Sequence, residues 1–207
     1  MLFRHGGTPY PSRWNHNVHY HGVILREIPK GARTALDVGC GNGLLTRELQ
    51  RVVPEVVGID ADERVLNQAR RDRGDVDWVL GDFLTHDFGR RFDVVASVAV
   101  LHHVPDLRAG LRRLAALTAP GGVLAVVGLA RATRLGDRLI HVPGLFQHWW
   151  FSARYGFWEH AAPTVWPPAH DYTTVRRVAA ELLPGMVWRH LPLWRYSLIW
   201  HHSGAVS

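Results

Sequence analysis

The segment LDVGCGNG, residues 36–43, decides the fold of this chain of 207 residues. Its first residues belong to a short apolar run at 35–38 that predicts a buried strand, and the segment precedes a helical pattern at 44–53. Gly39, Gly41 and Gly43 let the backbone of such a turn approach a ligand, and the first amides of the helix can donate to it. Two leucines stand where a dinucleotide-binding loop would continue to its last glycine. The turn therefore predicts a binding loop that does not cradle a pyrophosphate.

Two side chains inside this loop carry chemistry of their own. Asp37 is unfavourable beside an anionic pyrophosphate, whereas it suits a cationic ligand or an anchor for the loop. Cys40 has a small side chain that fits the turn, and the sequence shows no activating base for a thiol nucleophile. We interpret Cys40 as structural.

Short apolar runs and helical patterns alternate along the rest of the chain. The predicted strands are 35–38, 56–59, 76–80, 92–98, 123–127, 186–191 and 194–201. The predicted helices are 14–28, 44–53, 62–73, 106–118 and 173–183. This alternation predicts crossover units in a mostly parallel sheet, and the closely spaced last two strands predict an antiparallel hairpin.

Acidic residues stand at the ends of the second and third predicted strands. Asp60 follows the glycine loop by about 20 residues, where a carboxylate can accept hydrogen bonds from ribose hydroxyls. Asp82 offers a carboxylate to an adenine amino group, and Phe83 offers an aromatic face to the ring. A single Asp at a strand end is commonly a turn residue. Their serial placement at successive strand ends predicts a nucleoside as the ligand.

These motifs, in this order, resemble the class I S-adenosylmethionine-dependent methyltransferases, especially small single-domain enzymes that act on metabolites. The resemblance covers residues 34–128 and extends more loosely to the terminal hairpin. It rests on LDVGCGNG at 36–43, GID at 58–60, GDF at 81–83, FDVVASV at 92–98, VLHHV at 100–104 and APGGVL at 119–124.

The resemblance implies an α/β fold, a Rossmann-like seven-stranded mostly parallel sheet with helices on both faces. An antiparallel C-terminal hairpin would place the seventh strand beside the fifth. It also implies transfer of a methyl group from S-adenosylmethionine to a small organic acceptor, with S-adenosylhomocysteine as product. The residues expected to bind the cofactor are Asp37, Gly39, Cys40, Gly41, Gly43, Asp60, Ala61, Asp82, Phe83 and Val98.

We expect residues 1–207 to form one methyltransferase domain, because a chain of this length with 47% hydrophobic residues can bury one substantial core. Its expected parts are an N-terminal cap helix (13–28), a cofactor-binding core (34–128), an aromatic insertion or lid (130–170), and a last helix with the hairpin (171–201). Neither helix nor strand periodicity holds throughout the insertion.

No catalytic residue is assigned from the sequence. One of His102 and His103 could act as a base, but we favour a packing role at the junction between strand and helix. Asn17 and His21 are expected to be satisfied at the edge of the core. No acidic and histidine cluster has the spacing of a settled metal site, so no metal is expected.

The insertion between 130 and 170 concentrates aromatic side chains. They are Phe146, Trp149, Trp150, Phe151, Tyr155, Phe157, Trp158 and Trp166. Such residues could line a pocket for a flat or apolar metabolite, form a homodimer contact, or insert shallowly at a membrane surface. The sequence leaves all three open.

The formal net charge of +6 makes nucleic acid a partner to weigh. Residues 97–100, SVAV, lack the Asp/Asn-Pro-Pro-aromatic segment of enzymes that methylate amino groups of DNA and RNA, and no RNA-binding module is apparent. A small-molecule acceptor is therefore favoured over nucleic acid. The alternatives are an RNA methyltransferase, or a protein that binds the cofactor without transferring methyl groups.

A cytoplasmic location is expected from three features of the sequence. The chain has one cysteine, so an intrachain disulfide framework is impossible. Its N-terminal segment lacks the apolar core of a signal peptide, and no apolar stretch approaches the roughly 20 residues that a bilayer requires.

Overall fold

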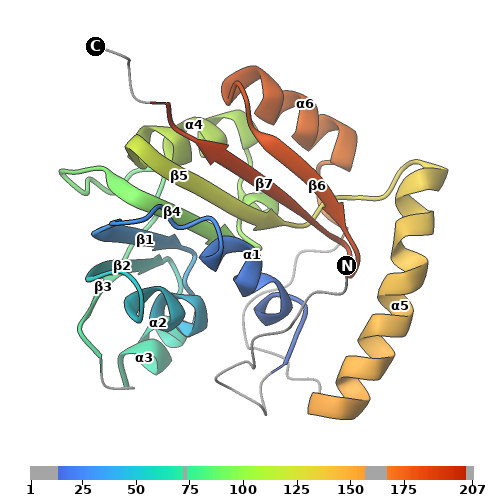
Figure 1. Ribbon diagram of the computed structural model, residues 1–207, viewed down its shortest axis with the longest axis horizontal. Helices are drawn as coiled ribbons and strands as arrows, with labels where there is room; N and C mark the ends of the chain where they lie inside the picture. The colour runs from blue at the N-terminus through green and yellow to red at the C-terminus, as the bar shows by residue number, and fades with distance from the viewer. Residues whose placement is uncertain (1–13, 72–73, 157–166, 204–207) are drawn as a thin grey trace.

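A single mixed sheet organises the chain in the computed structural model, which describes residues 14–71, 74–156 and 167–203 (Figure 1). The strands are β1 (Thr34–Val38), β2 (Glu55–Asp60), β3 (Val76–Leu80), β4 (Phe92–Val98), β5 (Thr118–Gly128), β6 (Val187–Leu191) and β7 (Arg195–His201). Within the described ranges the sheet has seven strands in the order β3-β2-β1-β4-β5-β7-β6. Strands β1 to β5 are parallel, and β7 lies antiparallel between β5 and β6. The predicted topology is confirmed, including the seventh strand beside the fifth.

Helices cover both faces of this sheet. They are α1 (His21–Leu25), α2 (Leu44–Gln50), α3 (Glu63–Arg71), α4 (Leu107–Leu117), α5 (Leu135–Tyr155) and α6 (Tyr172–Leu182), with two short 3-10 helices, η1 (Val18–Tyr20) and η2 (Leu101–His103). One buried cluster packs α4 and α6 on one face, and a second packs α1 and α2 on the other. The expectation of helices on both faces is confirmed.

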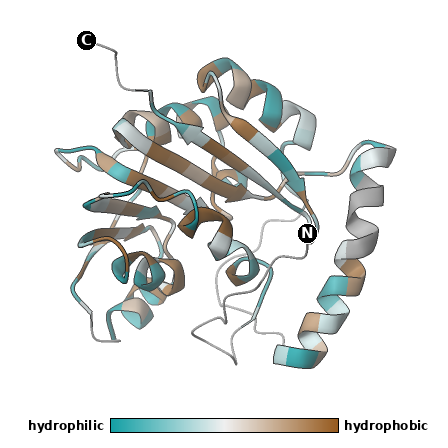
Figure 2. Cartoon of the chain, viewed as in Figure 1, coloured by the Kyte–Doolittle hydropathy of each residue, from teal (hydrophilic) through white to brown (hydrophobic). Residues whose placement is uncertain are grey.

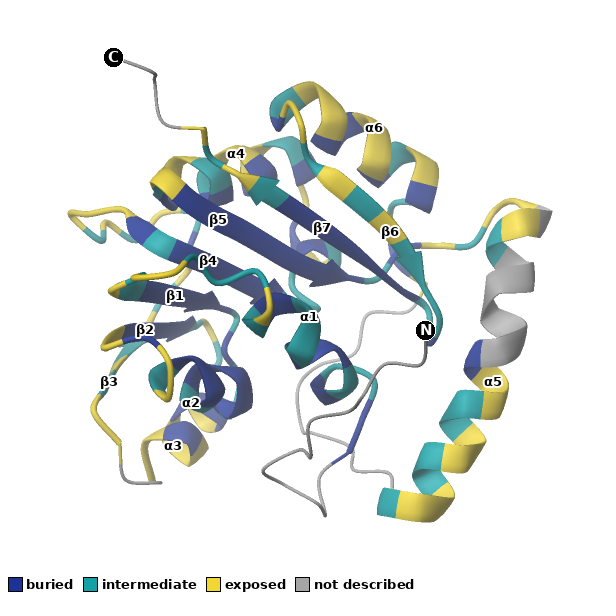
Figure 3. Ribbon diagram, viewed as in Figure 1, coloured by how far each residue is buried: buried dark blue, intermediate teal, exposed yellow. Residues whose placement is uncertain are grey.

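The central strands are apolar on both sides because both of their faces are covered. In β1, Leu36 and Val38 face the α4–α6 cluster, whereas Ala35 faces the α1–α2 cluster. Figure 2 shows the hydrophobic colouring of these strands, and Figure 3 shows that β1, β4, β5 and β7 are largely buried. This rigid layer holds the loops at the carboxyl ends of the parallel strands.

Helix boundaries agree with the sequence prediction where a capping residue is present. The Asp106 side chain accepts hydrogen bonds from the backbone N–H groups of Arg108 and Ala109, which fixes the start of α4. The end of α4 differs, because Thr118 already belongs to β5. The fifth strand was expected to start at Val123 after a turn, but β5 extends back to Thr118 with a register shift opposite β4.

The N-terminal cap helix is much shorter than expected. A helix over 14–28 was predicted, but the helical part reduces to η1 and α1, and residue 13 lies outside the described ranges. The Asn15 side chain accepts hydrogen bonds from the N–H groups of Asn17 and Val18, as a capping residue does, so the helical part starts only after this turn.

No helix or strand periodicity holds throughout 130–170, but the central part of this segment is helical. Residues Leu135–Tyr155 form α5, which stands beyond β6 at one end of the sheet (Figure 1). At Gly144 a Cβ atom would lie 2.6 Å from the backbone nitrogen of Leu193, so α5 crosses close to the β6–β7 turn there. Residues 157–166, with three of the expected aromatic side chains, lie outside the described ranges. In the described part of the chain no helix is long and apolar enough to span a bilayer.

Candidate functional site

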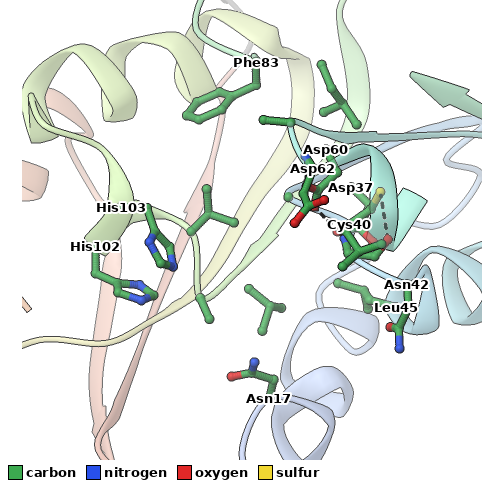
Figure 4. Close-up of a pocket in the computed structure, with 18 of the residues that line it drawn as sticks. Asn17, Asp37, Cys40, Asn42, Leu45, Asp60, Asp62, Phe83, His102 and His103 are labelled. Atoms are coloured by element: carbon green, nitrogen blue, oxygen red, sulfur yellow. Dashed lines mark hydrogen bonds between the residues drawn. The ribbon is translucent and has the colours of Figure 1, made fainter. Parts of the chain in front are cut away.

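A cavity of about 920 Å³ opens at the carboxyl ends of β1, β2 and β4 (Figure 4). Nine of the ten residues expected to bind a cofactor line it: Asp37, Gly39, Cys40, Gly41, Asp60, Ala61, Asp82, Phe83 and Val98. In parallel α/β sheets this edge is the usual ligand site. The volume lies near the upper end of the range of about 300–1,000 Å³ for small-molecule sites.

The glycine loop adopts a backbone conformation that other residues adopt only with strain. Gly39 and Gly41 have φ angles of 67° and 55°. A Cβ atom at Gly39 would lie 2.2 Å from Cγ2 of Val100, so this glycine permits close packing against the segment after β4. At Gly41 a Cβ atom would meet nothing within 4 Å. Because Gly41 also lines the cavity, its backbone is open to a ligand.

Gly43 is the one predicted cofactor residue that the structure does not place at the cavity. It precedes α2 in a left-handed conformation, with φ 78°. A Cβ atom there would lie 2.4 Å from the Trp78 ring, which also lies against Gly58 of the neighbouring strand. The packing of the Trp78 ring against this position therefore explains why residue 43 is a glycine.

The Asp60 carboxylate braces the loop from below. One oxygen accepts a hydrogen bond from the Gly41 N–H at 2.7 Å, and the other accepts one from the Asp62 N–H at 2.9 Å. A carboxylate has about four lone-pair positions, so each oxygen can accept one further hydrogen bond. Asp60 can thus hold the loop and still accept from two hydroxyl groups.

Asp82 and Phe83 form the far wall of the cavity after β3. An Asp82 oxygen accepts a hydrogen bond from the Leu84 N–H at 2.9 Å, which fixes the turn. The Phe83 ring is buried and points toward the cavity in Figure 4. This pairing of a carboxylate with an aromatic face suits a planar heterocycle that carries an amino group.

The thiol of Cys40 is unsuited to nucleophilic chemistry. Burial raises its pKa, and the nearby carboxylates of Asp37 and Asp60 add to that effect. The structural interpretation of this cysteine agrees with its environment.

Asp37 is an almost fully buried carboxylate, with 2% of its surface exposed. It accepts a hydrogen bond of 2.6 Å from the Thr46 hydroxyl, which ties β1 to α2. Burial raises its pKa to about 6, although the hydrogen bond from Thr46 opposes that change. Asp37 therefore anchors the loop, as one of its two predicted roles requires.

The raised pKa of Asp37 predicts a pH dependence of stability. The folded pKa of about 6 exceeds the ordinary aspartate value of 3.8, so the folded state binds the proton more tightly. Relative to Asp37→Asn, the free energy of unfolding should fall by about 3 kcal/mol in all as the pH rises from about 3, below both pKa values, to about 7, above both. Urea denaturation of both proteins across this range measures the difference, and parallel pH profiles would contradict it.

His102 and His103 stand across the cavity from Asp60 (Figure 4). Both histidines line the cavity, whereas Leu101 beside them is buried in the core, so the packing role favoured for the two histidines stays a prediction. Burial lowers the pKa of His102 to about 4, with a further contribution from His103. Burial also lowers the pKa of His103. The His102 ring is therefore neutral near pH 7.

Sequence comparison decides the family. A family profile described as a methyltransferase domain matches residues 10–170. An uncharacterized methyltransferase of Mycobacterium tuberculosis is 37% identical over 190 residues, which cover 90% of this chain and 96% of the relative. This chain belongs to the methyltransferase domain family. The resemblance seen in its motifs is confirmed.

Two solved structures extend this comparison. The N-methyltransferase NodS of Bradyrhizobium japonicum, in complex with S-adenosylhomocysteine, matches with a TM-score of 0.60 and 20% identity, over 89% of this chain and 86% of NodS. The amino pentose methyltransferase CalS10 of Micromonospora echinaspora, bound to S-adenosylmethionine, matches with a TM-score of 0.50 and 28% identity, over 55% of this chain and 50% of CalS10. NodS supports the methyltransferase fold, and CalS10 supports its core.

The N-terminal segment and β7 supply cavity residues of this methyltransferase that sequence reasoning did not assign to a site. They are Asn15, His16, Asn17, His21 and Arg195. His21 lies 3.3 Å from a carboxylate oxygen of Glu48, and the Asn17 side chain accepts a hydrogen bond from Arg195. The expectation that Asn17 and His21 are satisfied at the core edge is confirmed.

Helix α5 of the methyltransferase closes over the N-terminal segment. His148 lies 2.9 Å from His16, nitrogen to nitrogen, and the Phe151 ring packs 5.3 Å from Trp14. The other side of the helix exposes Leu145, Phe146, Trp149 and Trp150. The described residues contain no group of three or more His, Cys, Asp or Glu side chains that could hold a metal ion.

Proposed function

We propose that this chain transfers the methyl group of S-adenosylmethionine to a small organic molecule. The observation that carries the proposal is the cavity, in which the glycine loop, Asp60, Asp82 and Phe83 converge from three successive strand ends. In this assignment Asp60 accepts from the ribose hydroxyls, and Asp82 and Phe83 contact adenine.

The residues present fit this cofactor. Gly41 leaves room where a side chain would project, and Asp60 keeps two acceptor positions after bracing the loop. Asp37 adds a negative charge beside the loop when it is ionised, which favours a ligand that carries a positive charge. We assign Gly39, Cys40, Ala61 and Val98 to the wall that the cofactor contacts.

The chemistry places modest demands on the protein. S-adenosylmethionine supplies a methyl group on a positively charged sulfur, which is reactive toward an electron pair of the acceptor. The chain aligns the acceptor and excludes water, and such positioning can account for about 7–11 kcal/mol of a barrier. Neutral His102 is able to take a proton from an acceptor, but we assign it no catalytic role.

A small acceptor is supported by the similarity to CalS10, whose substrate class is an amino pentose. Membrane-surface contact, homodimer formation and a cytoplasmic location stay predictions. The exposed aromatic side of α5, formed by Leu145, Phe146, Trp149 and Trp150, offers a surface for either of the first two.

Transfer itself is tested with S-adenosylmethionine labelled on its methyl group. The purified protein is incubated with this cofactor and a metabolite extract, and label in small molecules is separated from label in RNA. We expect label in a small-molecule fraction, and much less in the same reaction with Asp60→Ala when the cofactor is kept near its wild-type dissociation constant. Binding of the cofactor without any labelled product would support the binding protein instead, and labelled RNA would support the RNA methyltransferase.

A further inference from the structure

Arg195 occupies a junction between two hollows. It begins β7, next to the end of β5, and lines the main cavity. It also lines a second, adjacent hollow of about 300 Å³, whose other described lining residues are His16, Leu129 and Trp194. Arg195 therefore borders both hollows, as His16 and Leu129 also do.

The guanidinium of Arg195 is a buried charge without a counterion among the described residues. The residue is 7% exposed, and burial lowers its pKa only to about 10, so it stays positive at neutral pH. Its hydrogen bonds go to the carbonyl oxygens of Leu193 and Trp194 and to the side chain of Asn17. These three bonds leave two of its five N–H donors unused, and Nε has no partner.

The titratable groups that influence this charge are uncharged at neutral pH. Burial raises the pKa of Tyr20 and of Tyr172, so both phenols keep their protons. Burial lowers the pKa of His16 to about 3 and that of His102 to about 4, and Arg195 contributes to both changes. An uncompensated buried charge costs several kcal/mol in real proteins, so the site favours an anion.

The strained backbone just before Arg195 presents two carbonyl oxygens to its guanidinium. Leu193 and Trp194 have φ angles of 58° and 57°, in the left-handed region that such residues rarely enter. Their carbonyl oxygens accept hydrogen bonds from Nη1 of Arg195. Strain of this kind costs about 1–3 kcal/mol per residue and clusters at ligand-binding sites.

We propose that Arg195 binds an anionic group, a carboxylate or a phosphate, carried by the methyl acceptor. This inference rests on the proposed function. Three strands, β1, β4 and β5, separate β7 from β2, which carries Asp60. At about 4.8 Å per strand the two residues lie on the order of 20 Å apart, so the nucleoside end of the cofactor does not reach Arg195. Asn17 orients the guanidinium, and the neutral His16 and His102 leave its charge unshielded.

The test uses three aromatic probes with matched shape: phenylacetate, phenyl phosphate and phenylacetamide. Each is titrated by calorimetry into the full chain saturated with S-adenosylhomocysteine. We expect one of the two anions to bind at least about tenfold more tightly than the neutral amide, with a dissociation constant of about 1 mM or lower. The better anion identifies the group as a carboxylate or a phosphate.

Two substitutions at Arg195 and one control assign the effect. Arg195→Gln should abolish the preference for the anion and leave the affinity for S-adenosylhomocysteine within about threefold of wild type. Arg195→Lys keeps the positive charge but loses the planar set of paired N–H donors, and it should weaken the preference for the anion. The Lys variant also tests the role of Arg195 if Arg195→Gln does not fold. Arg189→Gln, an exposed arginine on β6, should change nothing.

Three results would overturn the inference. They are equal binding of all three probes by wild type, binding of none, and an anion preference that survives Arg195→Gln. A fall of about tenfold or more in affinity for S-adenosylhomocysteine in Arg195→Gln or Arg195→Lys would assign the arginine to the cofactor instead. If wild type binds neither S-adenosylmethionine nor S-adenosylhomocysteine, the proposed function itself fails.

Discussion

Asp60→Ala is expected to weaken binding of S-adenosylhomocysteine by about 100-fold, because hydrogen bonds to a charged group contribute about 1.5–3 kcal/mol. The substitution removes the acceptor for the ribose hydroxyls. It also removes the brace that accepts the N–H of Gly41 and fixes the glycine loop. Isothermal titration of the wild-type and variant proteins measures the change.

A matched control for this variant is Asp171→Ala. Asp171 also accepts a backbone N–H, from Thr174 at the start of α6, but it does not line the cavity. Its loss should cost about 1 kcal/mol of stability and leave cofactor affinity unchanged. Asp60→Asn, which keeps one carbonyl oxygen, should fall between wild type and Asp60→Ala. Wild-type affinity in Asp60→Ala would refute the ribose assignment.

Alanine at Gly39 and at Gly41 should separate folding from binding. Gly39→Ala combines a left-handed backbone with a contact of 2.2 Å to Val100, so we expect a loss of about 3 kcal/mol in the free energy of unfolding. Gly41→Ala has only the backbone strain, about 1–2 kcal/mol, because its Cβ projects into open space. Its main effect should be a loss of about tenfold or more in cofactor affinity.

Gly89→Ala is the matched control for both glycine variants. Gly89 has φ 63° with open space around a Cβ atom, and it lies away from the cavity. It should lose stability as Gly41→Ala does and keep wild-type affinity. Chemical denaturation and calorimetric titration of the three variants give the comparison. Equal affinities in Gly41→Ala and Gly89→Ala would mean that the loop does not approach the ligand.

The parts of the fold and site that were predictable depend on local sequence. The glycine loop, Asp60 and Asp82 stand at or just after the ends of three strands, so the order of strands brings them to one edge of the sheet. The capped start of α4 at Asp106 is a local signal of the same kind. Here sequence spacing and tertiary position carry the same information.

The parts that were missed depend on tertiary contacts. Asn17 and Arg195 are 178 residues apart and meet only because β7 inserts beside β5. Helix α5 gave no clear period, since its aromatic residues are divided between a side that packs on Trp14 and a side that is exposed. Gly43 has the spacing of a ligand contact, yet the Trp78 ring accounts for it. No local pattern distinguishes these cases.

The central claim is that the cavity at the carboxyl ends of β1, β2 and β4 binds S-adenosylmethionine. Calorimetric titration of the full wild-type chain with S-adenosylmethionine and with S-adenosylhomocysteine tests it most directly. We predict one molecule bound per chain for each ligand, with competition between the two. Absence of binding by both ligands would contradict the account.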